Sequence, residues 1–168
     1  MFLLEPSTYG EAELQGIIPY WPKSWVVQFT VKILRDSPEE WIGITQFCHA
    51  ELTLNYGCRQ PNVAYNTKLK QIEVTLFHDK TNTADSNRII KYSEKVDLNT
   101  RYDIKLEVVL VSGIYYFQGV INRLLIFNRV EAANPDVFEN LHYHYGNLWG
   151  SAQNTIEISN LLYGGIED

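Results

Sequence analysis

From about residue 24 to the C-terminus, apolar and polar residues alternate along the chain with a period of two. The segment 25–33 shows this pattern most clearly. Its apolar residues share one face and its polar residues the other: Trp25, Val27, Phe29, Val31 and Ile33 against Gln28, Thr30 and Lys32. Successive side chains of a β-strand point to opposite faces. The pattern therefore predicts a half-buried antiparallel strand with the first set facing inward.

Further segments of this kind follow, and no long helical pattern competes with them. We expect strands at 24–34, 41–47, 50–56, 62–66, 71–77, 88–93, 102–111, 114–121, 123–130, 138–146 and 154–162. Short strands separated by Gly, Pro, Asn and Asp are typical of a sandwich or barrel. Two hairpin turns are expected, at Ser112-Gly113 and at Asn122-Arg123, because Gly and Asn accept a positive φ. The sequence thus predicts an all-β sandwich of two packed antiparallel sheets.

A chain of 168 residues is most simply one domain. We expect that domain to span 24–168, with residues 1–23 as an irregular lead-in that contains three prolines and two glycines, among them Pro19 and Gly16. Hydrophobic residues make up 45% and charged residues 20% of the chain, which is ordinary for a globular domain.

The net charge of −6 argues against nucleic-acid binding, which needs clustered Lys and Arg. No apolar stretch reaches the roughly 20 residues that a membrane-spanning helix needs, so no membrane insertion is expected. The apolar residues 1–4 are too few for a signal-peptide core. Either the protein stays inside the cell or the sequence is a mature or trimmed form.

The chain has two cysteines, Cys48 and Cys58, on either side of the candidate strand 50–56. A disulfide between them would close a short loop and stabilise the fold by about 2–3 kcal/mol. The alternative is two separate buried thiols, because free cysteine is often buried.

Three segments carry a resemblance to known families. Residues 56–61 (Tyr-Gly-Cys-Arg-Gln-Pro) are similar to a Gly-x-Arg-x-Pro signature after an early strand, and 102–127 looks like the penultimate hairpin of laminin G-like and pentraxin-like jelly rolls. The segments 138–149 and 156–161 resemble the ending of extracellular sandwich domains called farnesoic acid methyltransferase-like. The resemblance implies a concanavalin-like jelly roll in an extracellular recognition or matrix protein. Because the chain has no Gly-rich strand-to-helix loop for an adenosyl cofactor, we expect no methyl transfer.

The segment 140–149 is the main candidate for ligand binding. Tyr145 and Trp149 could form an aromatic platform for sugar stacking, with Asn140 and Asn147 to bond the hydroxyl groups. The alternative is that Trp149 fills the core.

A metal site is a second candidate. His142 and His144 share one face of the expected strand and could bind a transition metal if His49 or His78 supplied a third ligand. The alternative is a strand whose tyrosines face the core and whose histidines face solvent.

The polar segment 79–87 offers Asp79, Asn82 and Asp85 as oxygen ligands for calcium. It lacks the spacing of an EF-hand loop, and a solvated loop is the alternative. We expect no resident cofactor, with calcium as the one exception.

Catalytic motifs are not visible. There is no nucleophile elbow, and the acidic residues of the strands, including Glu73 and Glu107, alternate with apolar residues and so fall on outer faces. We therefore expect a non-enzymatic extracellular module that binds a glycan or a protein partner. The alternative is a self-assembling structural subunit, a homo-oligomer or a fibre, and a glycoside hydrolase-like activity is third.

Overall fold

A computed structural model of the chain describes residues 7–9, 13–49, 60–77, 88–122, 124–132, 135–146 and 155–166. Within these ranges the protein is built from strands: β1 (Ser7–Tyr9), β2 (Glu13–Trp21), β3 (Trp25–Ile33), β4 (Trp41–His49), β5 (Asn62–Asn66), β6 (Gln71–Phe77), β7 (Arg88–Lys95), β8 (Arg101–Val111), β9 (Ile114–Ile121), β10 (Leu124–Glu131), β11 (Phe138–Tyr145) and β12 (Ile156–Gly165). This part of the chain contains no helix with the length and apolar character that a membrane span requires.

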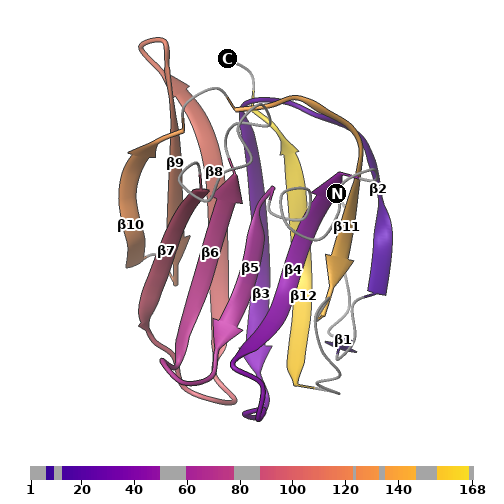
Figure 1. Cartoon of the computed structure of the whole chain (residues 1–168), viewed down its shortest axis with the longest axis vertical. Coiled ribbons are helices and arrows are strands. Elements are labelled where there is room, and N and C mark those ends of the chain that lie inside the picture. The colour runs from indigo at the N-terminus through magenta and orange to yellow at the C-terminus, as the bar shows by residue number, and fades with distance from the viewer. Residues whose placement is uncertain are drawn as a thin grey trace.

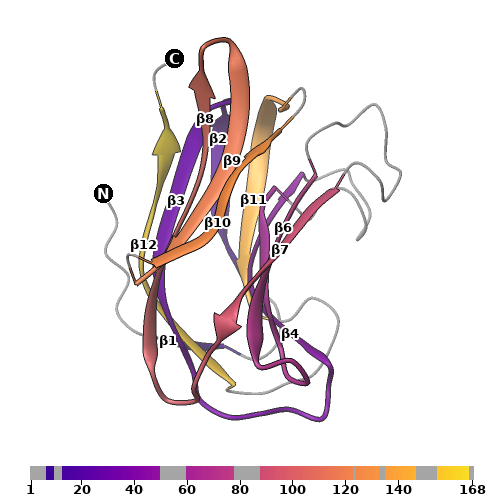
Figure 2. The same ribbon diagram turned by 90° about the vertical axis from the view of Figure 1, so that its left-hand side faces the viewer.

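The strands form two six-stranded antiparallel sheets that pack face to face as a concanavalin-like jelly-roll sandwich (Figures 1 and 2). Sheet I has the order β1-β12-β3-β8-β9-β10, and sheet II has the order β2-β11-β4-β5-β6-β7. Strands that are neighbours in a sheet are often distant in sequence, as for β3 beside β12 and β4 beside β11. The predicted two-sheet sandwich is confirmed.

The hydrophobic core lies between the sheets and follows the period-two pattern. In β3 the apolar set that begins with Trp25 is buried, with Phe29 at 1% exposure, and Gln28 is exposed. Trp21 of β2 links the sheets, because its ring lies 5.3 Å from that of Trp25 and 5.2 Å from that of Phe47. Aromatic pairs at such separations add to the stability that burial alone provides.

Two turns follow the expected chemistry. Ser112 and Gly113 both have positive φ, 52° and 82°, which is the conformation of a two-residue hairpin turn whose twist matches the strands. Asn122 also has a positive φ of 46°, and its backbone N–H donates to the carbonyl of Asp103. Arg123 lies outside the described residues.

The expectation of an irregular lead-in over 1–23 is wrong for 7–9 and 13–21, which form β1 and β2. Pro19 suggested a break, but β2 is the last strand of sheet II, and an edge strand tolerates a residue without an N–H group. Gly16 has a packing role, because a Cβ there would lie 2.7 Å from the ring of Tyr143. The strand expected at 50–56 lies outside the described residues.

Candidate functional site

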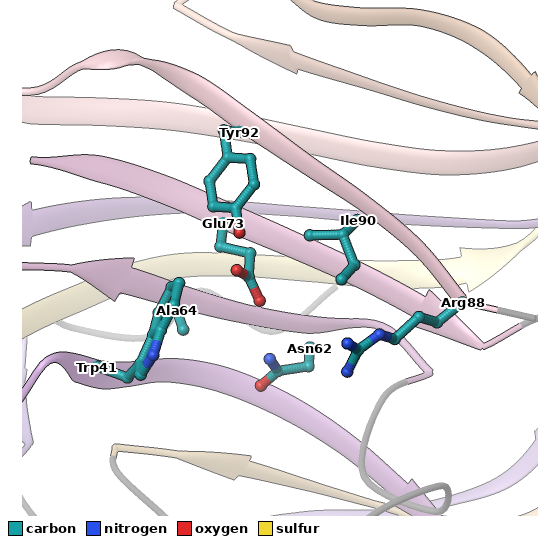
Figure 3. A pocket seen from close by; sticks show the side chains of 7 residues that line it. All are labelled: Trp41, Asn62, Ala64, Glu73, Arg88, Ile90 and Tyr92. Atoms are coloured by element: carbon teal, nitrogen blue, oxygen red, sulfur yellow. The ribbon is translucent and has the colours of Figure 1, made fainter. Parts of the chain in front are cut away.

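The outer face of sheet II, which points away from sheet I, carries a pocket of about 420 Å³. The pocket spans four adjacent strands and is lined by Trp41 of β4, Asn62 and Ala64 of β5, Glu73 of β6, and Arg88, Ile90 and Tyr92 of β7 (Figure 3). Its size lies within the range of ordinary ligand sites in proteins. The residues come together through strand pairing, because the segments that supply them are separated in sequence.

Strand register explains why this part of the sheet is hollow. Gly43 of β4 lies opposite Ala64 of β5, and Ala64 lies opposite Glu73, which in turn pairs with Tyr92. Directly opposed residues of an antiparallel pair have their Cβ atoms about 5 Å apart. Two small residues side by side therefore leave space, and the larger neighbours, such as Trp41, form its walls.

Glu73 is the carboxylate at the centre of the pocket. Thr75 donates a hydrogen bond to its Oε1 at 2.9 Å, and the phenol of Tyr92 donates a second one. Burial, together with the hydrogen bond to Glu73, raises the pKa of Tyr92 to about 12, so this phenol holds its proton more tightly than an ordinary tyrosine does. The two donors fix the orientation of the carboxylate, and Figure 3 shows it directed into the pocket.

Trp41 is held at the pocket wall by the loop that precedes it. Thr67, after β5, donates from its side chain to the carbonyl of Glu39 at 2.8 Å and from its backbone to that of Glu40 at 3.0 Å. Lys68 forms an ion pair with Glu40. These contacts fasten the β3–β4 loop to the β5–β6 turn next to the start of β4.

The polar end of the pocket continues toward β11. Asn62 is 4% exposed, and its direct partner on β4 is Gln46, which is completely buried. Gln46 pairs on its other side with His144 of β11. Burial, followed by the neighbouring His142, lowers the pKa of His144 below its usual 6.5, which favours the neutral imidazole at neutral pH.

The aromatic platform expected from the sequence is not formed as predicted. Tyr145 is fully buried between the sheets, so the expectation that it contacts a ligand is wrong. It points inward because it belongs to the inner face of β11, with Tyr143. Asn140 is exposed and has a φ of 53°, so it does not share a surface with Tyr145. Asn147 and Trp149 lie outside the described residues.

The two histidines expected to share a face do so. The rings of His142 and His144 are both half-buried and lie 6.4 Å apart. His78 and the side chain of His49 are not among the described groups. Among the groups that are, no cluster of three or more His, Cys, Asp or Glu residues could hold a metal ion. The candidate calcium ligands Asp79, Asn82 and Asp85 lie outside the described residues.

Cys48 lies on β4 opposite His142 and is disulfide-bonded. The alternative of two separate thiols is therefore wrong for this residue. Cys58 lies outside the described part of the chain, so its pairing with Cys48 stays a prediction.

No family profile matches the sequence, and no curated protein matches it. Solved structures do match. Trypanosoma rangeli sialidase superposes with a TM-score of 0.54 at 10% identity, over 83% of this chain and 20% of the sialidase. Alginate lyase A1-II′, described as a member of polysaccharide lyase family 7, gives 0.53 at 12% identity over 95% of this chain and 65% of the lyase. Alginate lyase AlyC3 gives 0.54 at 10% identity, over 92% and 67%.

These similarities establish the fold. They support the concanavalin-like architecture, but not the laminin G-like or farnesoic acid methyltransferase-like families. This chain spans a fifth of the sialidase and about two thirds of the lyases. The expectation of a non-enzymatic protein is contradicted, because these structural neighbours are enzymes that act on glycans. That expectation rested on the lack of a visible catalytic motif and on the resemblance to recognition modules, and the comparisons do not support that resemblance.

Sequence reasoning did not find the pocket. It placed Glu73 correctly on an outer face, but it singled out neither Trp41 nor Asn62. The available signal was the composition of 62–66, where two asparagines flank a small Ala64 at alternate positions. That pattern predicts a polar face with a gap in it, but not which strands border the gap.

Proposed function

We propose that this protein is a carbohydrate-active domain that binds a glycan on the outer face of sheet II and acts on it in the Trp41–Tyr92 pocket. The observation that carries the proposal is Glu73, a carboxylate held by two hydrogen-bond donors inside a pocket with an aromatic wall. The glycan-acting enzymes that share the fold support the same class of ligand. The disulfide at Cys48 supports an extracellular location, since disulfides persist in oxidising compartments.

The lining has the composition that a sugar needs. An indole ring such as Trp41 offers a flat apolar surface to the C–H groups of a pyranose ring, while its edge stays polar. Asn62 and Arg88, which Figure 3 shows at the end of the pocket away from Trp41, supply hydrogen-bonding groups for hydroxyl or acidic substituents. A mostly apolar hollow with a few placed polar groups is the usual form of a small-ligand site.

Glu73 is the residue to which we assign a direct chemical role. Typical glycosidases use two carboxylates on either side of the scissile bond. Glu73 is the one carboxylate among the described residues that line this pocket. Glu73 would therefore act as the base or stabilise developing positive charge, with Tyr92 orienting it through the phenol hydrogen bond.

The experiment is a cleavage assay on polysaccharides of different charge: alginate, cellulose and chitosan. Release of reducing ends reports cleavage, and ultraviolet absorbance of an unsaturated product distinguishes elimination from hydrolysis. Glu73→Gln should lower the rate by about 100-fold or more, the range for loss of an acid–base group. Glu107→Gln is the matched control, because Glu107 is a half-buried strand carboxylate of sheet I that also accepts a side-chain hydrogen bond.

Equal rates for the wild type and Glu73→Gln would refute the assignment of Glu73. A wild-type protein that neither cleaves nor binds any of the three polysaccharides would count against a carbohydrate-active function.

Self-assembly remains a second proposal, supported by one feature of β2. This edge strand exposes Leu14, Ile17 and Tyr20, each more than half exposed. An edge strand with apolar side chains can pair with another chain. Light scattering tests this proposal: a monomer at all concentrations would contradict it, and Ile17→Lys should reduce the mass of any oligomer.

A further inference from the structure

Two buried carboxamide oxygens at the end of the pocket have no hydrogen-bond donor. They are Oδ1 of Asn62 and Oε1 of Gln46. Both residues are more than nine-tenths buried, at 4% and 0% exposure. Most buried polar side-chain atoms in proteins have a partner, and an unpaired one costs stability, so each exception calls for an explanation.

Strand pairing brings these two groups together. Asn62 and Gln46 are direct cross-strand partners of β5 and β4. Side chains of such a pair stand on the same face, with their Cβ atoms about 5 Å apart. Asn62 also lines the pocket, so the pair is connected to the space in which we propose that the glycan binds.

The orientation of Gln46 is fixed by a second contact. Its Nε2 donates to the backbone carbonyl of Gly146 at 3.2 Å. A carbonyl accepts only from the amide nitrogen, so the oxygen of this carboxamide must point the other way. Gln46 therefore presents its oxygen as an acceptor, and the flipped orientation of its carboxamide is excluded by the bond to Gly146.

We propose that Asn62 forms a hydroxyl-binding subsite at the β4 side of the pocket, where its Oδ1 accepts a hydrogen bond from a hydroxyl group of a bound glycan, with the carboxamide of Gln46 as its buried neighbour. This inference rests on the proposed function and adds that, at this position of the pocket, the ligand presents a hydrogen-bond donor. Two acceptors side by side cannot satisfy each other, whereas sugar hydroxyls are donors. A carboxylate group of the ligand would be repelled by these oxygens, and an acidic substituent would instead bind the guanidinium of Arg88, which also lines the pocket.

The test compares two substitutions of Asn62. Asn62→Asp keeps an oxygen acceptor, whereas Asn62→Leu has a similar size and removes it. We expect Asn62→Leu to weaken binding by about tenfold or more, and Asn62→Asp to keep the affinity for the uncharged cellulose hexasaccharide within about threefold. Calorimetric titration with hexasaccharides of cellulose, chitosan and alginate measures this. Gln28→Glu, at an exposed position of β3 on sheet I, controls for the added charge.

A second measurement separates binding from a structural role. If Oδ1 is unpaired in the free protein, Asn62→Leu should leave the melting temperature unchanged or raise it while weakening binding. A lower melting temperature with unchanged affinity would show that the group bonds internally or to a buried water, and would overturn the subsite. Loss of binding with Asn62→Asp as large as with Asn62→Leu would also overturn it, while the proposed function would stand. If the wild type binds none of the hexasaccharides, both are overturned.

Discussion

Gly119 should be one of the least replaceable residues of sheet I. It lies in β9 between Leu106 of β8 and Phe127 of β10, and it is buried. A Cβ at this position would lie 2.6 Å from Cε1 of Phe127 and 2.9 Å from Cδ2 of Leu106. Both distances are shorter than carbon atoms tolerate, and both neighbours are packed in the core. Gly119→Ala must therefore displace at least one of them.

The expected cost is that of overpacking a core, about 1–3 kcal/mol. For a domain of this length, each kcal/mol lowers the melting temperature by about 2–4 °C. Gly164 of β12 is the matched control, because a Cβ there meets no atom within 4 Å and its φ is not positive. Gly164→Ala should stabilise by about 0.4–1 kcal/mol, since alanine restricts the unfolded chain more than glycine does.

Thermal and urea unfolding of the two variants should thus give shifts of opposite sign. A third variant identifies the cause. In a Phe127→Leu background, Gly119→Ala should destabilise the protein less than it does in the wild type, because the ring that contacts the new Cβ is absent. The double-mutant cycle measures this coupling. If Gly119→Ala unfolds like the wild type, or if both glycine variants shift alike, then the packing of β9 between β8 and β10 is not as described.

Three further predictions concern titration and the disulfide. Burial, with Asp36 as the nearby carboxylate, raises the pKa of Tyr65 from 10.0 to about 12, so the folded state holds this proton more tightly and the free energy of unfolding should fall as the pH rises from 10 to 12. Tyr65→Phe should reduce that fall, measured as urea midpoints against pH, and an unchanged pH dependence would contradict the prediction. Burial lowers the pKa of His144 below 6.5, so the unfolded state takes up the proton first and the free energy of unfolding should fall as the pH drops below 6.5. His144→Gln should remove part of this pH dependence, and identical stability profiles for the variant and the wild type would count against the prediction. Alkylation without reductant should label neither Cys48 nor Cys58 by mass spectrometry, and labelling of either would exclude the pair.

The strands of this protein could be predicted from sequence because most of them bury one face only. In β3 every second residue is buried, and in β8 the alternate residues Ile104, Leu106 and Val108 are, so a local pattern carries the signal. The turn at Ser112-Gly113 was equally local, since two positive φ angles need residues that accept them. β2 was not predicted, because Pro19 and Gly16 indicate an irregular segment when only the sequence is considered. They are tolerated here because β2 is an edge strand and Gly16 packs against Tyr143.

The pocket could not be predicted in the same way, because it depends on register across four strands. Each of its residues has an ordinary local context: Glu73 is a polar residue between apolar ones, and Ala64 is a small residue in a strand. Only the pairing of β4 with β5 and of β5 with β6 places Ala64 opposite Gly43 on one side and opposite Glu73 on the other. The same limit made Tyr145 attractive as a ligand contact, since its neighbours in sequence are polar while its inward direction depends on strand phase.

The two outer faces of the sandwich differ in how their polar groups are paired, and this difference favours sheet II as the functional face. On sheet I, Glu107 accepts from Gln118 and forms an ion pair with Lys105, and Thr30 donates to Asp103 at 2.7 Å. These polar groups therefore have their partners within the protein. On sheet II, the acceptors of Gln46 and Asn62 are buried beside a pocket and unpaired. Each unpaired buried acceptor lowers the free energy of unfolding of the free protein by about 1–3 kcal/mol. A ligand hydroxyl that donates to such an acceptor would therefore restore this stabilisation on binding to sheet II.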